Sequence, residues 1–179
     1  MASGRGRLLQ HLYKEIDSGR LEAEIGAVIC SRHCNAEEIG RLHNAEVFVI
    51  PGSPFCITME CLIRDYRIDL IALAGYTRKV ILPPQYYSKC INIHPSLLPK
   101  YGGEGMYGRR VHRAVLDAGE KETGCTVHLV DEEYDHGEHL IQRVCPVKPG
   151  DTPETLAARV FELEKTAYVE AIQSLLLQV

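Results

Sequence analysis

The apolar positions in the first half of the chain predict helices and strands in alternation. An apolar stripe with helical spacing runs through residues 7–17 and predicts a helix that ends at Gly19. The apolar run 69–75 ends in glycine and is typical of a strand buried on both faces. By the same patterns we expect strands over 24–30, 47–50 and 89–94 and helices over 36–45, 58–66 and 83–88. This repeated order predicts a parallel sheet with crossover helices.

The second half of the chain has a different pattern. Residues 95–108 form a loop rich in glycine and proline, and a helix is expected over 109–119. Two strand-like runs, 125–130 and 139–147, flank an acidic turn. Their closeness in the sequence predicts an antiparallel pair at one side of the sheet.

The last thirty residues, 150–179, predict a long amphipathic helix. Asp151 or Thr152 can cap its amino end, and Pro153 suits its first turn. Its apolar stripe consists of Leu156, Val160, Leu163, Ala167, Ala171 and Leu175. The predicted fold class is therefore α/β: a mostly parallel twisted sheet with flanking helices, an antiparallel strand at one side and a long C-terminal helix.

Length and composition indicate one ordinary globular domain of 179 residues, 45% hydrophobic, with a net charge of −4. The acidic balance gives no basic footprint for nucleic acid, and neither a membrane-spanning run nor a signal peptide is recognisable. The seven cysteines include no C-x-x-C pair and predict buried thiols in a reducing compartment. We therefore expect a cytoplasmic protein with no metal, no nucleic-acid partner and no membrane contact.

Two polar side chains stand at the end of the otherwise apolar strand 89–94. The period of two places Asn92 and His94 on one face of this strand, with Ile91 and Ile93 on the other. Burying such groups without partners is costly, and open α/β sheets place their sites at the carboxyl ends of strands. Asn92 and His94 are therefore candidate site residues.

Three phrases carry a resemblance to a known family. INIHPSLLPKYGG, GCTVHLVDEEYDHG and CPVKPGDTPETLAARV resemble the glycinamide ribonucleotide formyltransferases, within the wider group of enzymes that use 10-formyltetrahydrofolate. The resemblance runs from about residue 3 to residue 172. It implies a Rossmann-like fold and the transfer of a formyl group from 10-formyltetrahydrofolate to the amine of glycinamide ribonucleotide in purine biosynthesis. It implies small-molecule substrates and requires no metal.

By this resemblance the catalytic residues are Asn92, His94 and Asp135, with His128 as a supporting residue grouped with the folate site. The residue types suit formyl transfer, because Asn92 and a protonated His94 can donate hydrogen bonds to the oxyanion that develops on the formyl oxygen. Asp135 has two plausible roles: to keep His94 protonated, and to relay a proton from the amine to N10 through water.

The segment AGYTRKV resembles the family's folate-pocket segment and makes Tyr76, Thr77, Arg78 and Val80 candidate folate contacts. This version is more polar than the family pattern, through Thr77 and Lys79.

The opening stretch SGRGR resembles the family's loop for the substrate phosphate, formed here by Ser3, Gly4, Arg5, Gly6 and Arg7. Arg7 replaces a serine of the pattern and can hold a phosphate, or it can indicate a different phosphorylated substrate. Glu164 falls where the family uses a glutamate on the ribose hydroxyls.

Two further functions stay open from the sequence. One is the same folate chemistry on another acceptor, either another amine or water, as in a deformylase. The other is a catalytically silent binding or scaffolding protein that retains the fold. The assembly is expected to be a monomer or a homodimer.

We also expect two halves, 1–88 for the phosphate and amine substrate and 89–179 for catalysis and folate, within the single domain 1–179. A strand normally precedes a phosphate loop of this kind and would be central in a Rossmann-type sheet. Because only Met1 and Ala2 precede SGRGR, we expect the sheet to lack its first strand, with about five apolar residues missing upstream.

Overall fold

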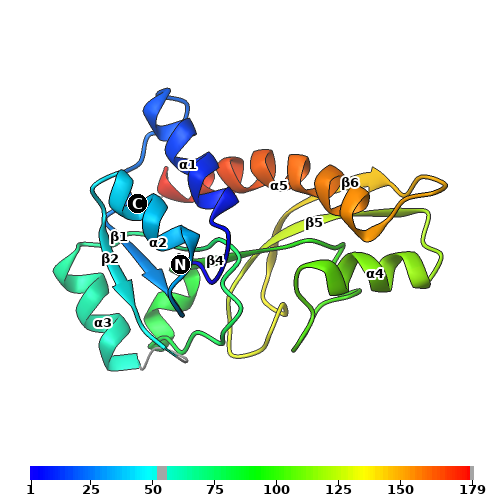
Figure 1. Ribbon diagram of the computed structural model, residues 1–179. Helices are drawn as coiled ribbons and strands as arrows, with labels where there is room; N and C mark the ends of the chain where they lie inside the picture. The colour runs from blue at the N-terminus through cyan, green and yellow to red at the C-terminus, as the bar shows by residue number, and fades with distance from the viewer. Residues whose placement is uncertain (52–55, 178–179) are drawn as a thin grey trace. The chain divides into compact units, whose positions relative to one another are not determined.

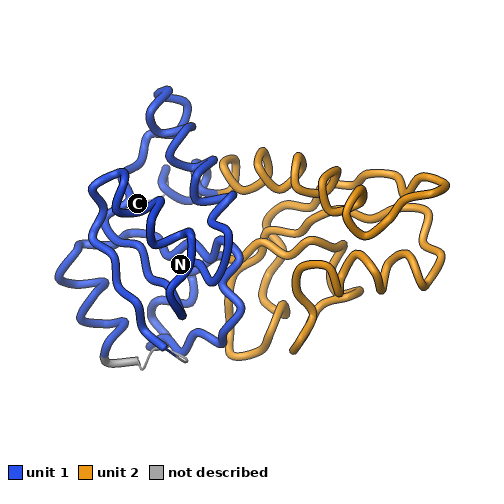
Figure 2. Tube along the Cα trace, viewed as in Figure 1, with its two compact units in different colours: residues 1–91, 172–179 blue, residues 92–171 orange. Residues whose placement is uncertain are grey.

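The structure is a computed structural model that describes residues 1–51 and 56–177. Its backbone contacts divide the chain into two compact units, shown in different colours in Figure 2. Unit 1 comprises Met1–Ile91 and Ile172–Val179, and unit 2 comprises Asn92–Ala171.

Unit 1 contains the predicted alternation of helices and strands (Figure 1). Its elements are α1 (Arg7–Asp17), β1 (Ala27–Cys30), α2 (Asn35–Leu42), β2 (Glu46–Val49), α3 (Cys56–Asp65), β3 (Ile71–Leu73) and the 3₁₀ helix η1 (Pro84–Lys89). The predicted order is confirmed. β1 and β3 are shorter than the apolar runs that predicted them, because an apolar run reports burial and not the extent of strand pairing.

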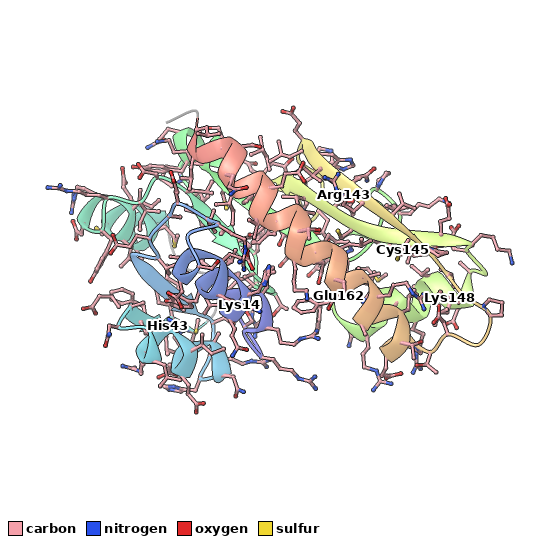
Figure 3. The ribbon with its side chains drawn as sticks, turned by 90° about the horizontal axis from the view of Figure 1, so that it is seen from above. Lys14, His43, Arg143, Cys145, Lys148 and Glu162 are labelled. Atoms are coloured by element: carbon pink, nitrogen blue, oxygen red, sulfur yellow. The ribbon has the colours of Figure 1, made fainter. Side chains whose placement is uncertain are left out.

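In unit 1, β1 and β2 form a parallel pair with Val28 opposite Val47. α1 buries the predicted stripe, including Leu9, Leu12 and Tyr13. The Tyr13 ring stacks on His43, with ring centroids 3.8 Å apart. Figure 3 labels His43 at the end of α2 and Lys14 on α1. Packing of the helical stripe therefore covers this part of the sheet.

The first three residues lie between β1 and β3. Ala2 N–H donates to Ile29 O at 2.9 Å and makes an isolated parallel bridge to β1. Ala74 N–H donates to Met1 O at 2.8 Å, and the Met1 ammonium donates to Ala72 O at 2.6 Å. This short stretch therefore pairs with the edges of two strands at once.

Unit 2 contains the end of β4 (Cys90–His94), the strands β5 (Glu122–Leu129) and β6 (His139–Pro146), and two helices. β5 lies between β4 and β6 and pairs with β6 antiparallel, which confirms the predicted hairpin. The helices are α4 (Arg109–Asp117) and α5 (Pro153–Leu176), whose last residues belong to unit 1. Figure 1 shows α4 and α5 on opposite faces of β5 and β6.

Helix α5 is capped and anchored by polar contacts at its start. Thr155 N–H donates to Thr152 Oγ1 at 3.3 Å, so Thr152 is the cap, while Asp151 accepts two hydrogen bonds from Arg159 at 2.6 and 2.8 Å. Further along, Arg143 on β6 pairs with Glu170 at 2.5 Å. Figure 3 shows α5 crossing β6, with Glu162 labelled on the helix and Arg143 and Cys145 on the strand.

The described residues contain no helix long and apolar enough to span a membrane. Cys30, Cys34, Cys61, Cys90, Cys125 and Cys145 are free thiols, and four of them, Cys30, Cys90, Cys125 and Cys145, are buried. Burial raises the pKa of Cys90 to about 12, which keeps this thiol protonated and unreactive.

Two side chains of the hairpin, Thr126 and Gln142, hold the start of the Gly/Pro-rich loop after β4. Thr126 Oγ1 donates to Ser96 O at 2.7 Å and accepts from Leu98 N–H at 3.1 Å. Gln142 Nε2 donates to the same oxygen at 2.9 Å and to Leu98 O at 3.0 Å. Because Thr126 is fully buried, water cannot replace these bonds.

We expect Thr126→Val to lower the free energy of unfolding by about 3 kcal/mol, because the loop groups lose a partner in a buried place. The measurement is urea denaturation. Thr123→Val is the matched control: its hydroxyl is buried without a hydrogen-bond partner among the described residues, so its removal should be neutral or stabilising. Equal losses in both variants would contradict the assignment.

Candidate active site

The carboxyl end of β4 presents the two polar residues that the strand period predicted. Ile91 and Ile93 are buried on one face, while Asn92 and His94 lie on the other. The His94 side chain is only 4% exposed, so its ring nitrogens require partners within the protein.

Asp135 lies in the turn between β5 and β6 and contacts both Asn92 and His94. Its backbone is left-handed, with φ of 54°, a conformation that aspartate and asparagine tolerate better than other non-glycine residues. Asp135 Oδ2 lies 3.2 Å from His94 Nδ1 and accepts from Gly103 N–H at 3.0 Å, while Oδ1 accepts from Asn92 Nδ2 at 3.2 Å. Residues more than forty positions apart in sequence therefore meet at one carboxylate.

Asp135 is held as a carboxylate. Burial alone would raise its pKa, but the rings of His128 and His94, the charge on His94 and the Gly103 amide outweigh burial and hold the pKa well below its usual range. The site therefore carries a fixed negative charge at neutral pH.

His94 is doubly hydrogen-bonded. Its Nδ1 faces the Asp135 carboxylate, and its Nε2 lies 2.8 Å from Tyr101 O. A carbonyl and a carboxylate oxygen can only accept, so both ring nitrogens carry hydrogens in this arrangement. The geometry thus favours an imidazolium beside an ionised aspartate.

His128 completes the cluster beneath Asn92. Its Nδ1 donates to Leu129 O at 2.7 Å. Its Nε2 lies 3.1 Å from Asn92 Nδ2 and 3.6 Å from Asp135 Oδ1. The ring is therefore held by Leu129 O against both the Asn92 amide and the Asp135 carboxylate.

Another histidine, His112 of α4, is buried and not hydrogen-bonded through Nδ1 to any described residue. Burial, with a smaller effect from the charge of His94, lowers its pKa to about 4. His112 is therefore neutral next to a charged site.

We expect acid to destabilise the protein through His112. The unfolded chain binds a proton below about pH 6.5 and the folded chain only below about pH 4, so stability falls as pH drops through this window. The full effect on the free energy of unfolding is about 3 kcal/mol, at 1.36 kcal/mol per unit of pKa shift.

The measurement is the difference between the unfolding free energies at pH 7 and pH 4.5, which should be smaller in His112→Phe than in the unaltered protein. The exposed His139→Asn is the control, and an unchanged pH dependence in His112→Phe would contradict the expectation.

The predicted phosphate loop lies in unit 1, between β1 and β3. Ser3 is buried: its hydroxyl accepts from Ser31 Oγ at 2.8 Å and from Thr77 N–H at 3.1 Å. Gly6 has φ of 68° at the start of α1, and a Cβ there would lie 2.7 Å from Ile39 Cδ1. Gly4 is partly buried, whereas Arg5 and Arg7 are exposed at the amino end of α1. The amino end of a helix carries positive dipole charge, which suits an anion site.

The predicted folate segment follows β3 in unit 1. Tyr76 and Val80 are buried, while Thr77 and Arg78 are exposed. Thr77 N–H bonds to Ser3 Oγ and Gly75 O accepts from Ser3 N–H at 3.1 Å, so the structure joins this segment to the phosphate loop.

Glu164 lies half-buried on α5 in unit 2. Two histidines near the turn between β5 and β6 do not meet at one site: His136 pairs with Asp131 at 2.7 Å, and His139 is exposed on β6. The described residues contain no cluster of three histidine, cysteine, aspartate or glutamate side chains that could hold a metal ion.

Sequence reasoning missed four groups at these sites. Tyr101 and Gly103 act through backbone atoms, and Tyr101 has φ of 59°. The two glycines after Tyr101 were the sequence feature that could have indicated these backbone contacts, since close backbone approach favours glycine. Ser31 and Arg32 follow β1, and Arg32 Nε donates to Ser3 O at 2.9 Å.

Comparison with known proteins gives a consistent match. The sequence profile described as formyl transferase matches residues 1–172. Phosphoribosylglycinamide formyltransferase of Haemophilus influenzae is 37% identical over 94% of this chain and 81% of its own. The chloroplastic phosphoribosylglycinamide formyltransferase of Vigna unguiculata is 36% identical over 97% of this chain, which spans only 58% of that relative.

Comparison with solved structures indicates the same family. The crystal structure of phosphoribosylglycinamide formyltransferase from Coxiella burnetii superposes with a TM-score of 0.83 at 37% identity. The match covers 96% of this chain and 82% of the other. The predicted α/β fold with a mostly parallel sheet and a long C-terminal helix is confirmed by this agreement.

Proposed function

The chain belongs to the formyl transferase family, and we propose that it transfers a formyl group from 10-formyltetrahydrofolate to the amine of glycinamide ribonucleotide in purine biosynthesis. The observation that carries the proposal is the buried cluster in which Asn92, His94 and Asp135 meet within 3.2 Å contacts. Relatives with this activity by name support the choice of substrate.

In the proposed reaction the substrate amine attacks the formyl carbon, forming a C–N bond and leaving negative charge on the formyl oxygen. Asn92 and the His94 imidazolium are the donors for that charge, and a preorganised donor of this kind typically contributes 10²–10³ in rate. In the structure His94 Nε2 faces Tyr101 O, and Asn92 Nδ2 donates to Asp135 Oδ1. The anionic oxygen is a strong acceptor, so it can compete with these oxygens for a hydrogen bond from either donor.

Collapse of the intermediate breaks the bond between the formyl carbon and N10. The proton lost by the attacking amine must reach N10, which leaves with the bonding electron pair. Asp135 is ionised and can accept the proton and pass it on through water. Its second role is to hold the charge of His94, so the two roles proposed for Asp135 are compatible.

We assign substrate binding to the predicted site residues outside the catalytic cluster. We assign the phosphate to the loop Ser3–Arg7, where Gly4 and Gly6 allow close approach and Arg5 and Arg7 supply charge. The pterin is assigned to the segment with Tyr76, Thr77, Arg78 and Val80, and the ribose hydroxyls to Glu164. Arg7 stands at the amino end of α1, and its guanidinium can hold phosphate through two hydrogen bonds.

The decisive experiment is an assay of the purified protein with 10-formyltetrahydrofolate and, separately, glycinamide ribonucleotide, other amines and water. Formylation of glycinamide ribonucleotide with the highest kcat/KM supports the proposal. Hydrolysis of 10-formyltetrahydrofolate without an amine would make the protein a deformylase. If tetrahydrofolate were released in none of these reactions, the protein would be a silent binding protein. Either result overturns it.

Arg7→Ala should raise the KM for glycinamide ribonucleotide at least about tenfold while kcat changes little, because a charge-assisted phosphate contact acts on binding. Arg41→Ala, an exposed arginine that pairs with Glu37 at 3.1 Å, is the control. An unchanged KM in Arg7→Ala would remove Arg7 from the phosphate site.

We propose a cytoplasmic enzyme that acts on small molecules alone as a monomer or homodimer, supported by the bacterial relative, although plant relatives are named chloroplastic.

A further inference from the structure

Two cysteines stand at the two ends of the turn that joins β1 to α2 in unit 1 (Figure 1). Cys30 is the last residue of β1, and Cys34 is the N-cap of α2. Cys30 is fully buried, whereas Cys34 is partly exposed and packs against the apolar cluster that contains Cys30. The pair therefore combines a thiol that a small molecule can reach with a thiol enclosed by protein.

The two thiols are neighbours in space as well as in sequence. The Cys34 thiol is a hydrogen-bond partner of Cys30, and after burial it is the next cause that raises the pKa of Cys30, to about 12. Cys34 has extended backbone angles, φ −164° and ψ 167°, directly before the first residue of α2. A disulfide needs Cβ atoms about 3.8 Å apart, so joining two neighbouring thiols across this turn requires only a local adjustment.

The turn between the two cysteines holds the loop that we assign to phosphate. Ser31 Oγ donates to Ser3 Oγ at 2.8 Å, and Arg32 Nε donates to Ser3 O at 2.9 Å. From the first turn of α2, Ala36 N–H donates to Gly4 O at 3.3 Å. The start of the phosphate loop is therefore bonded to the turn and to the helix that follows it.

We propose that Cys30 and Cys34 form a reversible oxidation site, at which a peroxide joins the two thiols in a disulfide and thereby weakens binding at the phosphate loop. Cys34 attacks the peroxide as its thiolate, which breaks the O–O bond, forms a sulfenic acid on Cys34 and releases hydroxide. The hydroxide takes the proton of Cys30. The Cys30 thiolate then attacks the Cys34 sulfur, which forms the S–S bond and expels a second hydroxide.

This sequence balances in atoms and electrons. The second hydroxide takes up the proton that Cys34 released at the start, so two thiols and one hydrogen peroxide give one disulfide and two waters. The two sulfurs together lose two electrons, and the peroxide gains them. In a reducing compartment a bond of this kind is transient, because thiol exchange breaks it again.

Exposure and charge set the order of the two steps. Cys34 meets the peroxide first because Cys30 is fully buried. Charge on the Cys34 thiolate contributes to the raised pKa of Cys30, and conversion of Cys34 to a neutral sulfenic acid removes this contribution. The second step is therefore easier after the first. Cys90 differs, because burial accounts for its raised pKa and oxidation of Cys34 leaves that burial unchanged.

Closing the disulfide moves the start of α2 relative to the phosphate loop. The bond brings the two sulfurs to about 2.05 Å, which draws Cys34 and the first turn of α2 toward the end of β1. This turn already packs tightly against the loop, since a Cβ added at Gly6 would lie 2.9 Å from Ala36 Cα. The movement therefore changes the contacts of Ser3 and Gly4. Its effect on substrate binding rests on the proposed function, whereas the disulfide itself does not.

The test treats the purified protein with hydrogen peroxide and afterwards with dithiothreitol. Peroxide should remove two hydrogen atoms from the intact mass, and peptide mapping should place the new bond between Cys30 and Cys34. The KM for glycinamide ribonucleotide should rise at least about fivefold while kcat changes less than about twofold, because the loop acts on binding. Hydrogen exchange at the Ala36 amide should speed up, and dithiothreitol should reverse all three changes.

Two variants provide the controls. Cys34→Ser removes the reachable thiol while serine suits the N-cap, so this variant should fold normally, form no disulfide with Cys30 and keep its KM in peroxide. Cys61→Ser removes a partly exposed free thiol of α3 and should respond to peroxide as the unaltered protein does.

Three results would overturn the proposal: addition of oxygen atoms without a bond between Cys30 and Cys34, a disulfide that leaves exchange at Ala36 unchanged, and an active enzyme whose KM ignores the disulfide. A protein that formylates no acceptor would contradict the proposed function instead. In that case the mass, the peptide map and the exchange at Ala36 still decide whether this is an oxidation site coupled to the loop.

Discussion

Replacing Asp135 with asparagine is expected to lower kcat for formyl transfer by about 10³-fold while the protein stays folded. The variant keeps the side-chain shape and tolerates the left-handed backbone at this position, where φ is 54°. It removes the negative charge that faces His94 Nδ1 at 3.2 Å and the only carboxylate proposed for the proton relay. Loss of a general base and of one charged donor together accounts for the expected size of the decrease in kcat.

The fold can adapt to this change because His94 can release its Nδ1 proton and accept from the new amide. Thermal denaturation should therefore show a loss of only a few degrees. Asp131→Asn is the matched control: it makes the same substitution in the same turn, where Asp131 pairs with the exposed His136. If Asp135→Asn and Asp131→Asn turned over equally fast, Asp135 would not be catalytic.

Gly137→Ala is expected to damage both stability and activity. A Cβ at this position would lie 2.0 Å from Leu129 O, far inside van der Waals contact, and backbone cannot yield as a flexible side chain does. The same carbonyl accepts from His128 Nδ1, and Leu129 N–H donates to Glu138 O at 2.8 Å. Displacing Leu129 would therefore release His128, and with it the orientation of Asn92.

We expect a loss of about 4 kcal/mol in unfolding free energy and at least a 100-fold loss of kcat/KM. Gly119→Ala separates steric clash from backbone strain. Gly119 has φ of 68° but nothing within 4 Å of an added Cβ, so it should cost about 1–2 kcal/mol and leave activity unchanged. Similar losses of stability and activity in both variants would contradict the clash at Leu129.

The sequence predicted most of the fold because its local patterns agree with the tertiary structure. The stripe on residues 7–17 became α1, and the period of two on β4 correctly separated Asn92 and His94 from their apolar neighbours. Strand limits were less well predicted: the run 69–75 is a strand only over Ile71–Leu73, because side-chain burial continues where pairing stops.

The site was predictable only as far as side-chain identity carries information. Asp135 by itself reads as a turn residue, and only the resemblance placed it with His94. The Tyr101 carbonyl and the Gly103 amide left no side-chain signal, since any residue supplies these atoms. His112 looks like an ordinary residue of an amphipathic helix, and its depressed pKa arises from burial beside His94, which pattern does not report.

The two hydrogen bonds of Ser3 have a consequence for how the two proposed substrates affect each other's binding. It accepts the Thr77 amide, while Ser3 N–H donates to Gly75 O, so the loop assigned to phosphate and the segment assigned to pterin share two hydrogen bonds. A ligand that orders one of them lowers the entropy left for the other to lose. For the proposed reaction we therefore expect the two substrates to bind cooperatively, each tightening the other by the same factor.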